Sequence, residues 1–355
     1  MIKETLKAGE KPLPTPAEIV AKLDEYVIGQ DSAKKILAVA TYNQYKRVRF
    51  NLAEGGLEIK KSNVLMIGPT GSGKTYISQT LAKIFDIPFA SISATELLSG
   101  ENKIAPFIER ALTNLVNDAN GNIDLAEQGI VFIDEIDKVA KRGANIGVGE
   151  SVQQQLLKVI EGFQFKLPDF EREIDTTNIL FVFGGVFVGL DGIVYNRTGA
   201  ALSLDDLFSK IETEDIVKFG MIPEFVGRVP TIITLKGLDT RALIKVLTKS
   251  KGSLVLQYKK MLEADGVELE FADDALIAIA EKAYALNTGA RSLQGIMERI
   301  MREVMFKAPT EKGLVKVIIT KAAVLEREEP IYEYDTIEND APLTPIPPLP
   351  VHYLV

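Results

Sequence analysis

The sequence predicts an α/β protein with a parallel sheet covered by helices, followed by a smaller, mostly helical domain. Up to Gly237, short β-rich apolar runs alternate with longer amphipathic stretches, a spacing typical of parallel sheets with helical crossovers. After Gly237 the β signal fades and helical periodicity takes over. A chain of 355 residues, of which 46% are hydrophobic, is long enough to form two such cores.

The elements before the first strand are predicted to be helical. Residues 1–12 are expected to be a flexible N-terminus, and Leu13 opens the folded part. A short helix is expected over Ala17 to Leu23, and a turn at Gly29. Asp31 is then placed to cap a longer amphipathic helix.

Four β-rich runs are expected to form the parallel sheet of a large domain over residues 13–236. They span Asn63 to Ile67, Gly129 to Ile133, Asn178 to Phe183 and Thr231 to Leu235. A small domain is expected over residues 237–325, with helices over Thr240 to Leu262, Asp273 to Ala285 and Ser292 to Met305 and one weak strand over Val315 to Ile319.

Residues 326–355 read as an acidic, proline-rich tail that is expected to be disordered. The tail has seven acidic residues against one basic residue, so it carries most of the formal net charge of -8, and it holds six of the 16 prolines. Such a composition favours an extended or disordered appendage over a docked segment. Because the end of the tail is apolar, a second interpretation remains, in which the tail is a peptide ligand for an unidentified partner.

Composition excludes several classes of protein and site. With no cysteine and one histidine, the chain cannot form a disulfide framework or a zinc site of the thiolate or multi-histidine kind. The longest uncharged apolar run, Ile179 to Leu190, has 12 residues, against about 18 for a spanning helix. The N-terminus lacks the apolar stretch of a secretory signal. We therefore expect a soluble, cytoplasmic protein with no membrane partner, and the negative charge argues against nucleic acid.

A glycine-rich motif of the form G-x-x-x-x-G-K-[ST] lies between the first predicted strand and a helical pattern. It consists of Gly68, Pro69, Thr70, Gly71, Ser72, Gly73, Lys74 and Thr75. Glycines let backbone N–H groups turn toward phosphate oxygens, and the helix N-terminus adds its positive dipole end. Lys74 is expected to reach the β- and γ-phosphates, and the Thr75 hydroxyl to bind Mg²⁺.

Two adjacent carboxylates, Asp134 and Glu135, end the apolar run that starts at Ile130. Asp134 is expected to hold the Mg²⁺ shell and Glu135 to orient and polarise the attacking water. Taken alone, this pattern is more often a plain strand end, but the glycine-rich motif reverses the odds. Asp137 and Lys138 are expected to form a solvated turn or a contact with a neighbouring element.

These motifs and several others resemble the ClpX family, the hexameric AAA+ unfoldases of the Clp protease, from Leu13 to Leu325. The matching segments are Tyr26 to Gln30, Gly68 to Thr75, Ile130 to Lys138, Val152 to Gly162, Lys218 to Arg228 and Thr288 to Arg291. The segment that ends at Arg228 looks more like ClpX than like the related HslU unfoldases. The resemblance implies an AAA+ P-loop ATPase fold with ATP and Mg²⁺ as cofactors.

The resemblance also implies roles for four further residues. Val27 and Ile28 would pack on adenine, Arg228 would be an arginine finger, and Arg291 would be the sensor-2 arginine of the same chain. Without the resemblance, the apolar pair is ordinary core and the arginines are ordinary surface residues. Because the finger would reach the γ-phosphate of a neighbouring subunit, catalysis by Lys74, Asp134, Glu135 and Arg228 is expected to need a homohexameric ring.

The sequence departs from the family pattern in four places. With no cysteine, the four-cysteine zinc domain of the family is expected to be absent. The pore-loop stretch, Leu97 to Ile104, has no aromatic residue, and the nearby Phe107 is expected to pack in the core. Phe163 to Glu173 replaces the basic Arg-Lys-His loop, and Thr198 to Ser203 lacks the Ile-Gly-Phe tripeptide that docks on ClpP. These departures argue against an aromatic grip on polypeptide and against docking on ClpP.

Two classes of function remain. The first is an ATP-driven ring that unfolds or remodels protein substrates; the second is an ATPase switch or assembly factor that neither threads polypeptide nor feeds a peptidase. A nucleotide-independent structural protein fits poorly, because Lys74, Asp134, Glu135, Arg228 and Arg291 occur together. We favour the first, acting as an autonomous chaperone with no peptidase activity of its own.

Overall fold

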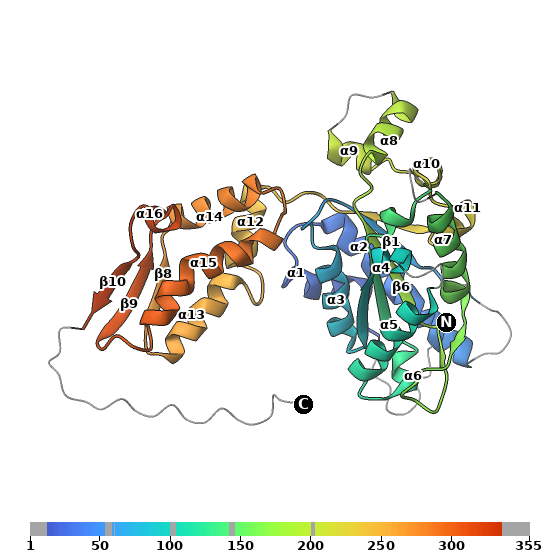
Figure 1. Ribbon diagram of the computed structural model, residues 1–355, viewed down its shortest axis with the longest axis horizontal. Coiled ribbons are helices and arrows are strands. Elements are labelled where there is room, and N and C mark those ends of the chain that lie inside the picture. Colours follow the sequence, from blue (N-terminus) through green and yellow to red (C-terminus); the bar gives the residue numbers. More distant parts are fainter. Residues whose placement is uncertain are drawn as a thin grey trace.

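A computed structural model describes residues 13–53, 59, 61–99, 104–141, 146–199 and 203–335. Two sheets, each with its own helices, lie next to each other along the long axis of the molecule (Figure 1). We call residues 13–236 the N-terminal part and residues 237–335 the C-terminal part. Among the described residues, no helix is long and apolar enough to cross a bilayer.

The N-terminal part is built on a five-stranded parallel sheet with strand order β2-β3-β6-β1-β7. The strands are β1 (Val64–Ile67), β2 (Phe89–Ser93), β3 (Ile130–Asp134), β6 (Leu180–Gly185) and β7 (Thr231–Thr234). The central strands β1, β3 and β6 are buried almost throughout, because helices cover both faces of the sheet. The expected α/β fold with a parallel sheet is confirmed.

Helices from the start of the chain cover one face of this sheet. They are α1 (Pro16–Asp24), α2 (Asp31–Ala53) and α3 (Lys74–Phe85). Helix α1 begins with a capping box in which Thr15 and Glu18 satisfy each other's backbone N–H groups. Buried Ile19, Leu37 and Ile77, one from each helix, pack together in a core that includes Met66 of β1.

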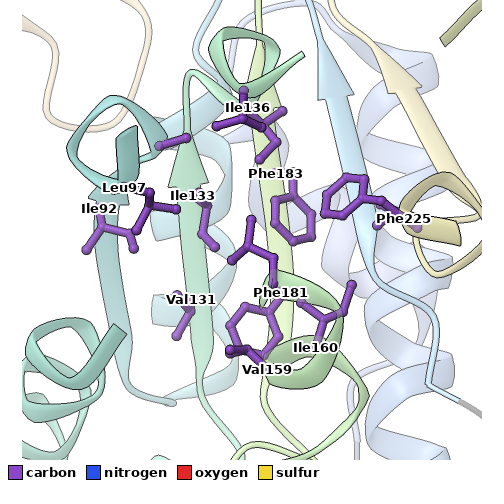
Figure 2. Packing of buried hydrophobic residues seen from close by; sticks show 14 of the residues in the cluster. Ile92, Leu97, Val131, Ile133, Ile136, Val159, Ile160, Phe181, Phe183 and Phe225 are labelled. Atoms are coloured by element: carbon purple, nitrogen blue, oxygen red, sulfur yellow. The ribbon is translucent and has the colours of Figure 1, made fainter. Parts of the chain in front are cut away.

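The opposite face of the sheet carries the larger core, which lies under α4 (Ala94–Ser99), α5 (Ala105–Asp118) and α7 (Ile146–Glu161). Figure 2 shows Ile133 and Phe183 of neighbouring strands pointing into this core. The rings of Phe183 and Phe225 meet edge to face, with 5.0 Å between their centroids. Phe107 packs against the same core, as the sequence predicts.

The remaining elements of the N-terminal part are short. They are α6 (Ile123–Ala126), the 3₁₀ helix η1 (Ile136–Val139), the antiparallel pair β4 (Gln164–Phe165) and β5 (Ile174–Asp175), α8 (Leu190–Thr198), α9 (Leu204–Phe208), α10 (Thr213–Phe219) and α11 (Pro223–Gly227). Helices α8 and α9 project from the top of the N-terminal part in Figure 1. Arg197 ties α8 to α10 by bonding both carboxylate oxygens of buried Asp215 at 2.9 and 2.8 Å.

The C-terminal part is mostly helical but contains more strand than its sequence predicts. Its helices are α12 (Thr240–Thr248), α13 (Leu254–Ala264), α14 (Asp273–Ala285), α15 (Arg291–Lys307) and α16 (Lys321–Val324). They pack on a three-stranded sheet of order β10-β9-β8, formed by β8 (Glu268–Phe271), β9 (Leu314–Ile319) and β10 (Ile331–Tyr334). The weak strand predicted near Val315 is the central strand of this sheet.

The prediction that the tail is disordered from Glu326 onward is wrong for residues 326–335. Strand β10 pairs antiparallel with β9, and Ile331 lies opposite Ile318. The Lys307 ammonium lies 4.4 Å from the Tyr332 ring centroid and 3.2 Å from a Glu329 carboxylate oxygen. The tail's overall acidity hid the short run Ile331–Tyr334, whose aromatic and β-branched residues favour a strand. Residues 1–12 and 336–355 lie outside the described residues, so their expected flexibility stays a prediction.

Candidate nucleotide-binding site

The glycine-rich motif forms the turn between β1 and α3, at the carboxyl edge of the parallel sheet. Gly71 and Gly73 adopt φ values of +72° and +96°, which residues with a Cβ atom rarely adopt. Gly73 is the N-cap of α3, and its carbonyl accepts the first helical hydrogen bond from Ile77 N at 2.9 Å. The free N–H groups of the first helical turn therefore face the end of the sheet, where an anion is favoured.

Lys74, the first residue of α3, is buried with 8% of its surface exposed. Its ammonium donates to the carbonyl oxygens of Gly68 at 2.7 Å and Pro69 at 3.1 Å. Burial lowers the pKa of Lys74, and the negative charges of Asp134 and Asp137 oppose that shift. The Ser72 hydroxyl in the same turn is buried and has no hydrogen-bond partner among the described residues. The turn thus contains donors whose present partners are weak or missing, as a phosphate-binding loop requires.

Asp134 and Glu135 lie at the end of β3. Glu135 adopts a left-handed backbone conformation with φ +57°, and its N–H donates to Asp134 Oδ1 at 2.9 Å. Its own carboxylate accepts hydrogen bonds from Ser93 Oγ at 2.9 Å and from Thr95 Oγ1 at 3.4 Å. Ser93 ends the neighbouring strand β2 and pairs in register with Asp134. Sequence analysis missed Ser93 and Thr95, because only the pairing of β2 with β3 brings these hydroxyls to the carboxylate.

A cavity of about 470 Å³ lies where the glycine-rich turn meets the C-terminal part. Its walls bring together most of the residues singled out in the sequence, including Val27, Ile28, Thr75, Asp134, Glu135 and Arg291. The lining also includes apolar residues of the C-terminal part, Leu238, Val246, Leu254 and Leu293. The lining therefore combines a glycine-rich turn and polar side chains with apolar side chains, which suits a nucleotide with its phosphates and its base.

The two parts of the chain also meet through backbone atoms at this cavity. The Ala290 N–H donates to the Gly71 carbonyl oxygen at 3.2 Å. Arg291, the first residue of α15, follows directly and is exposed. The start of α15 is thus bonded to the glycine-rich turn, and Arg291 lies beside it.

Arg228 lies outside this cavity. It caps the C-terminus of α11, and its Nε atom lies 2.7 Å from Glu161 Oε1. The two residues line a separate cavity of about 230 Å³ that also contains Arg47 and Lys61.

Of the two alternatives expected for Asp137, a solvated turn or a contact with a neighbouring element, the structure shows the contact. Asp137 is 8% exposed and accepts a hydrogen bond from Val186 N at 3.3 Å. Val186 directly follows β6, so this hydrogen bond ties the turn after β3 to the end of β6.

The donor set suits a magnesium ion better than a metal held by protein alone. Among the described residues, no group of three or more His, Cys, Asp or Glu side chains is placed to hold a metal. Mg²⁺ usually binds one or two protein oxygens and completes its shell with water and substrate phosphates. The Thr75 hydroxyl and the Asp134 carboxylate, on the same cavity wall, fit that pattern.

Comparison with known proteins gives the family. Residues 59–232 match the AAA domain (Cdc48 subfamily), and residues 238–321 match the C-terminal, D2-small domain, of ClpB protein. The ATP-dependent Clp protease ATP-binding subunits ClpX of Borrelia duttonii (strain Ly) and Borrelia recurrentis (strain A1) are each 44% identical over 339 residues, which cover 88% of this chain and 79% of theirs. The chain belongs to the ClpX family. The ClpX subunit of Treponema denticola is 42% identical over 339 residues, covering 88% of this chain and 81% of its own.

Membership of the ClpX family confirms the AAA+ fold predicted from the motifs. It favours the unfoldase and chaperone class over the switch or assembly factor. The departures at two loops stay predictions, because residues 100–103 of the pore-loop stretch and residues 200–202 of the docking stretch lie outside the described residues. The stretch in place of the basic loop is described, and it contains β4 and the connection to β5, with which β4 forms a short hairpin.

Proposed function

We propose that this chain is an ATP-dependent protein unfoldase or chaperone subunit of the ClpX type, working as a homohexameric ring. The observation that carries the proposal is the cavity between the two parts, which joins a glycine-rich turn, two strand-end carboxylates and an arginine of the C-terminal part. A nucleotide bound there touches both parts of the chain. Its hydrolysis can therefore move one part against the other and displace loops that hold a protein substrate.

Val27 and Ile28 pack against the adenine, and the backbone N–H groups of residues 68–75 bind the phosphates. Lys74 exchanges its two carbonyl partners for β- and γ-phosphate oxygens. This exchange is favourable because a buried ammonium gains more from an anion than from neutral carbonyls. Arg291, at the start of α15, reports the state of the nucleotide to the C-terminal part.

Thr75 and Asp134 would hold Mg²⁺, and the ion would supply charge neutralisation at the phosphates. Glu135 orients the attacking water and accepts its proton. The hydrogen bonds from Ser93 and Thr95 hold one oxygen of the Glu135 carboxylate, so the other is left to face the water.

Arg228 acts on the nucleotide of a neighbouring subunit. Its place outside the cavity of its own chain supports this role, because the residue is anchored elsewhere and half exposed. An arginine that reaches the γ-phosphate in trans accounts for about 10³ to 10⁵ in hydrolysis rate. The ring is therefore required for catalysis, and a single chain hydrolyses ATP slowly.

Residues 13–236 and 237–335 are proposed as the large and small AAA+ domains, the second extended by β10 beyond the boundary expected from sequence. The chain is an ATPase without peptidase activity of its own, and its partners are protein substrates rather than nucleic acid. Without the Ile-Gly-Phe tripeptide after Arg197, we propose remodelling without ClpP.

The test is ATP-driven unfolding of fluorescent proteins fused to a panel of unstructured tags, with and without ClpP. We expect fluorescence to fall with ATP and Mg²⁺ alone for at least one tag, and Glu135→Gln protein to leave it unchanged. An active ATPase that unfolds none of the panel would contradict the unfoldase role. Unfolding that requires ClpP would contradict autonomous action.

A further inference from the structure

We propose that Glu161 is a positioning residue for Arg228, which it holds in the orientation needed to reach a neighbouring nucleotide. The inference rests on the proposed function, in which Arg228 is the finger that acts in trans. The central contact is the ion pair of 2.7 Å between Arg228 Nε and Glu161 Oε1.

The backbone of Arg228 is fixed relative to the central sheet. Its N–H donates to the Phe225 carbonyl oxygen at 3.0 Å, and its own carbonyl oxygen accepts from Asn63 Nδ2 at 3.0 Å. Asn63 in turn accepts from Phe181 N at 3.3 Å, next to β1. Phe225 is buried against Phe183. The starting point of the Arg228 side chain is therefore set by the core.

The backbone of Glu161 is equally fixed. Glu161 is the last residue of α7, and the side chain before it, Ile160, is buried. The next residue, Gly162, has φ +127°, and a Cβ atom there would lie 2.5 Å from Thr177 Oγ1. The helix therefore ends in a turn that only glycine fits. The Glu161 side chain at this helix end lies next to Arg228 at the end of α11.

With both backbones fixed, the ion pair selects the rotamer of the guanidinium. The two side chains are 49% and 44% exposed, so packing alone leaves them room to rotate. An ion pair at this exposure adds little to stability, but it is strong enough to favour one rotamer by up to about fivefold. The contact therefore acts on the orientation of the Arg228 side chain and contributes little to the stability of the fold.

The atom used in the contact matters. Glu161 contacts the guanidinium at Nε, and within the described residues neither terminal nitrogen of Arg228 forms an ion pair. The two terminal nitrogens are the fork that binds phosphate oxygens bidentately. Pairing at Nε therefore steadies the side chain and leaves the fork for an incoming phosphate.

The charges that line the same cavity also support a positioning role for Glu161. The cavity shared with Arg228 also contains the Arg47 guanidinium and the Lys61 side chain, and Glu161 is the one carboxylate among its described lining residues. Without Glu161, no carboxylate among these lining residues would attract the Arg228 guanidinium, and the charge of Arg47 would repel it. The side chain would then turn away from the cavity into positions that do not serve catalysis.

The test is steady-state ATP hydrolysis by assembled rings of Glu161→Gln, Glu161→Asp, Arg228→Ala and the Glu161→Gln/Arg228→Ala double variant. We expect Glu161→Gln to lower kcat about three- to fivefold, the range that a pair of this exposure allows, with KM within twofold. Glu161→Asp should recover at least half of the loss, and Glu161→Gln should cost nothing further in the Arg228→Ala background. The control is Glu150→Gln on the same helix as Glu161, which breaks the pair of 2.6 Å between Glu150 and Lys141 and should leave kcat unchanged.

Three results would overturn the inference. An unchanged or raised kcat with a lower KM would make Glu161 a competitor of the phosphate. An equal further loss in the Arg228→Ala background would mean that Glu161 acts through another residue. Loss of ring assembly in both Glu161 variants would make the contact structural. If Arg228→Ala itself keeps full activity, the proposed finger fails and the inference fails with it, which separates this outcome from the other three.

Discussion

Gly71 and Gly289 approach each other so closely that neither position has room for a side chain. A Cβ atom on Gly289 would lie 2.6 Å from the Gly71 carbonyl oxygen, and one on Gly71 would lie 2.0 Å from the Thr288 carbonyl oxygen. Both residues also have positive φ, +72° and +57°. The glycine-rich turn and the start of α15 are therefore in direct backbone contact, so nucleotide binding at the turn and the position of the C-terminal part are linked.

Gly289→Ala should weaken nucleotide binding about tenfold or more. The new Cβ atom must push α15 away from the glycine-rich turn and open the cavity between the two parts. Strain of this kind costs about 1 to 3 kcal/mol. Titration of a fluorescent ATP analogue with Mg²⁺ measures the effect. The control is Gly266→Ala, where φ is +77° but nothing lies within 4 Å of the added Cβ; an equal loss of affinity in both variants would show that backbone strain alone is responsible.

Lys74→Ala and Glu135→Gln should separate binding from hydrolysis. Removing the ammonium of Lys74 leaves the phosphate charges without their buried cation, so ATP affinity should fall below detection at ordinary concentrations. Glu135→Gln keeps the shape of the side chain but cannot accept a proton, so ATP should bind normally and hydrolysis should fall by about 10² or more. Equilibrium binding and turnover, measured on both proteins, check this. Normal turnover in either variant would remove the assigned role.

Ser93→Ala combined with Thr95→Val should lower kcat about tenfold without changing ATP affinity. The two hydroxyls hold one oxygen of Glu135, and without them the carboxylate samples orientations that do not face the water. Single-turnover hydrolysis and equilibrium binding distinguish the two effects. Ser91→Ala, at an exposed position of the same strand, is the matched control and should behave like the unmodified protein. A double variant with unchanged kcat would show that Glu135 needs no such support.

The lowered pKa of Lys61 predicts how the free energy of unfolding depends on pH. Burial, with repulsion from Arg47, lowers the pKa of Lys61 from 10.5 to about 7. Between these two values the unfolded chain holds one more proton at Lys61 than the folded chain, so this residue makes the folded state more stable as pH rises from about 7 toward 10. The contribution to the slope is at most about 1.4 kcal/mol per pH unit.

Urea unfolding at pH 7 and pH 9 measures that contribution. The gain in unfolding free energy between the two pH values should be smaller in Lys61→Met than in the unmodified protein, whatever the absolute stability of the variant. Lys83→Met, on the exposed face of α3, is the control and should keep the full gain. Equal gains in all three proteins would mean that Lys61 titrates in its ordinary range.

The sequence predicted the strands that are buried on both faces and the edge strand β7, and it missed the edge strands β2, β8 and β10. Strands β3 and β6 are continuous apolar runs, which stand out in a sequence. Strands β2, β8 and β10 lie at sheet edges, have exposed positions and contain serine or glutamate. Their assignment depends on the neighbour with which they pair, and local composition does not carry that information.

The residues of the candidate site also fall into those that the sequence predicted and those that it missed. The glycine-rich turn and the pair Asp134–Glu135 are local patterns, and the chemistry of phosphate binding makes them readable before any fold is known. The contacts of Ser93 with Glu135, of Gly71 with Gly289 and of Glu161 with Arg228 join residues far apart in the chain. No spacing in the sequence encodes them, because packing of whole elements creates them.

Mixing two inactive variants tests the central claim most directly. Glu135→Gln subunits keep Arg228 but cannot hydrolyse their own ATP, and Arg228→Ala subunits keep an intact cavity but lack the finger. If Arg228 acts on a neighbouring subunit, rings assembled from equal amounts of both should hydrolyse ATP well above the sum of the separate activities. If the mixed rings show only that sum, the finger does not act in trans and the ring account is contradicted.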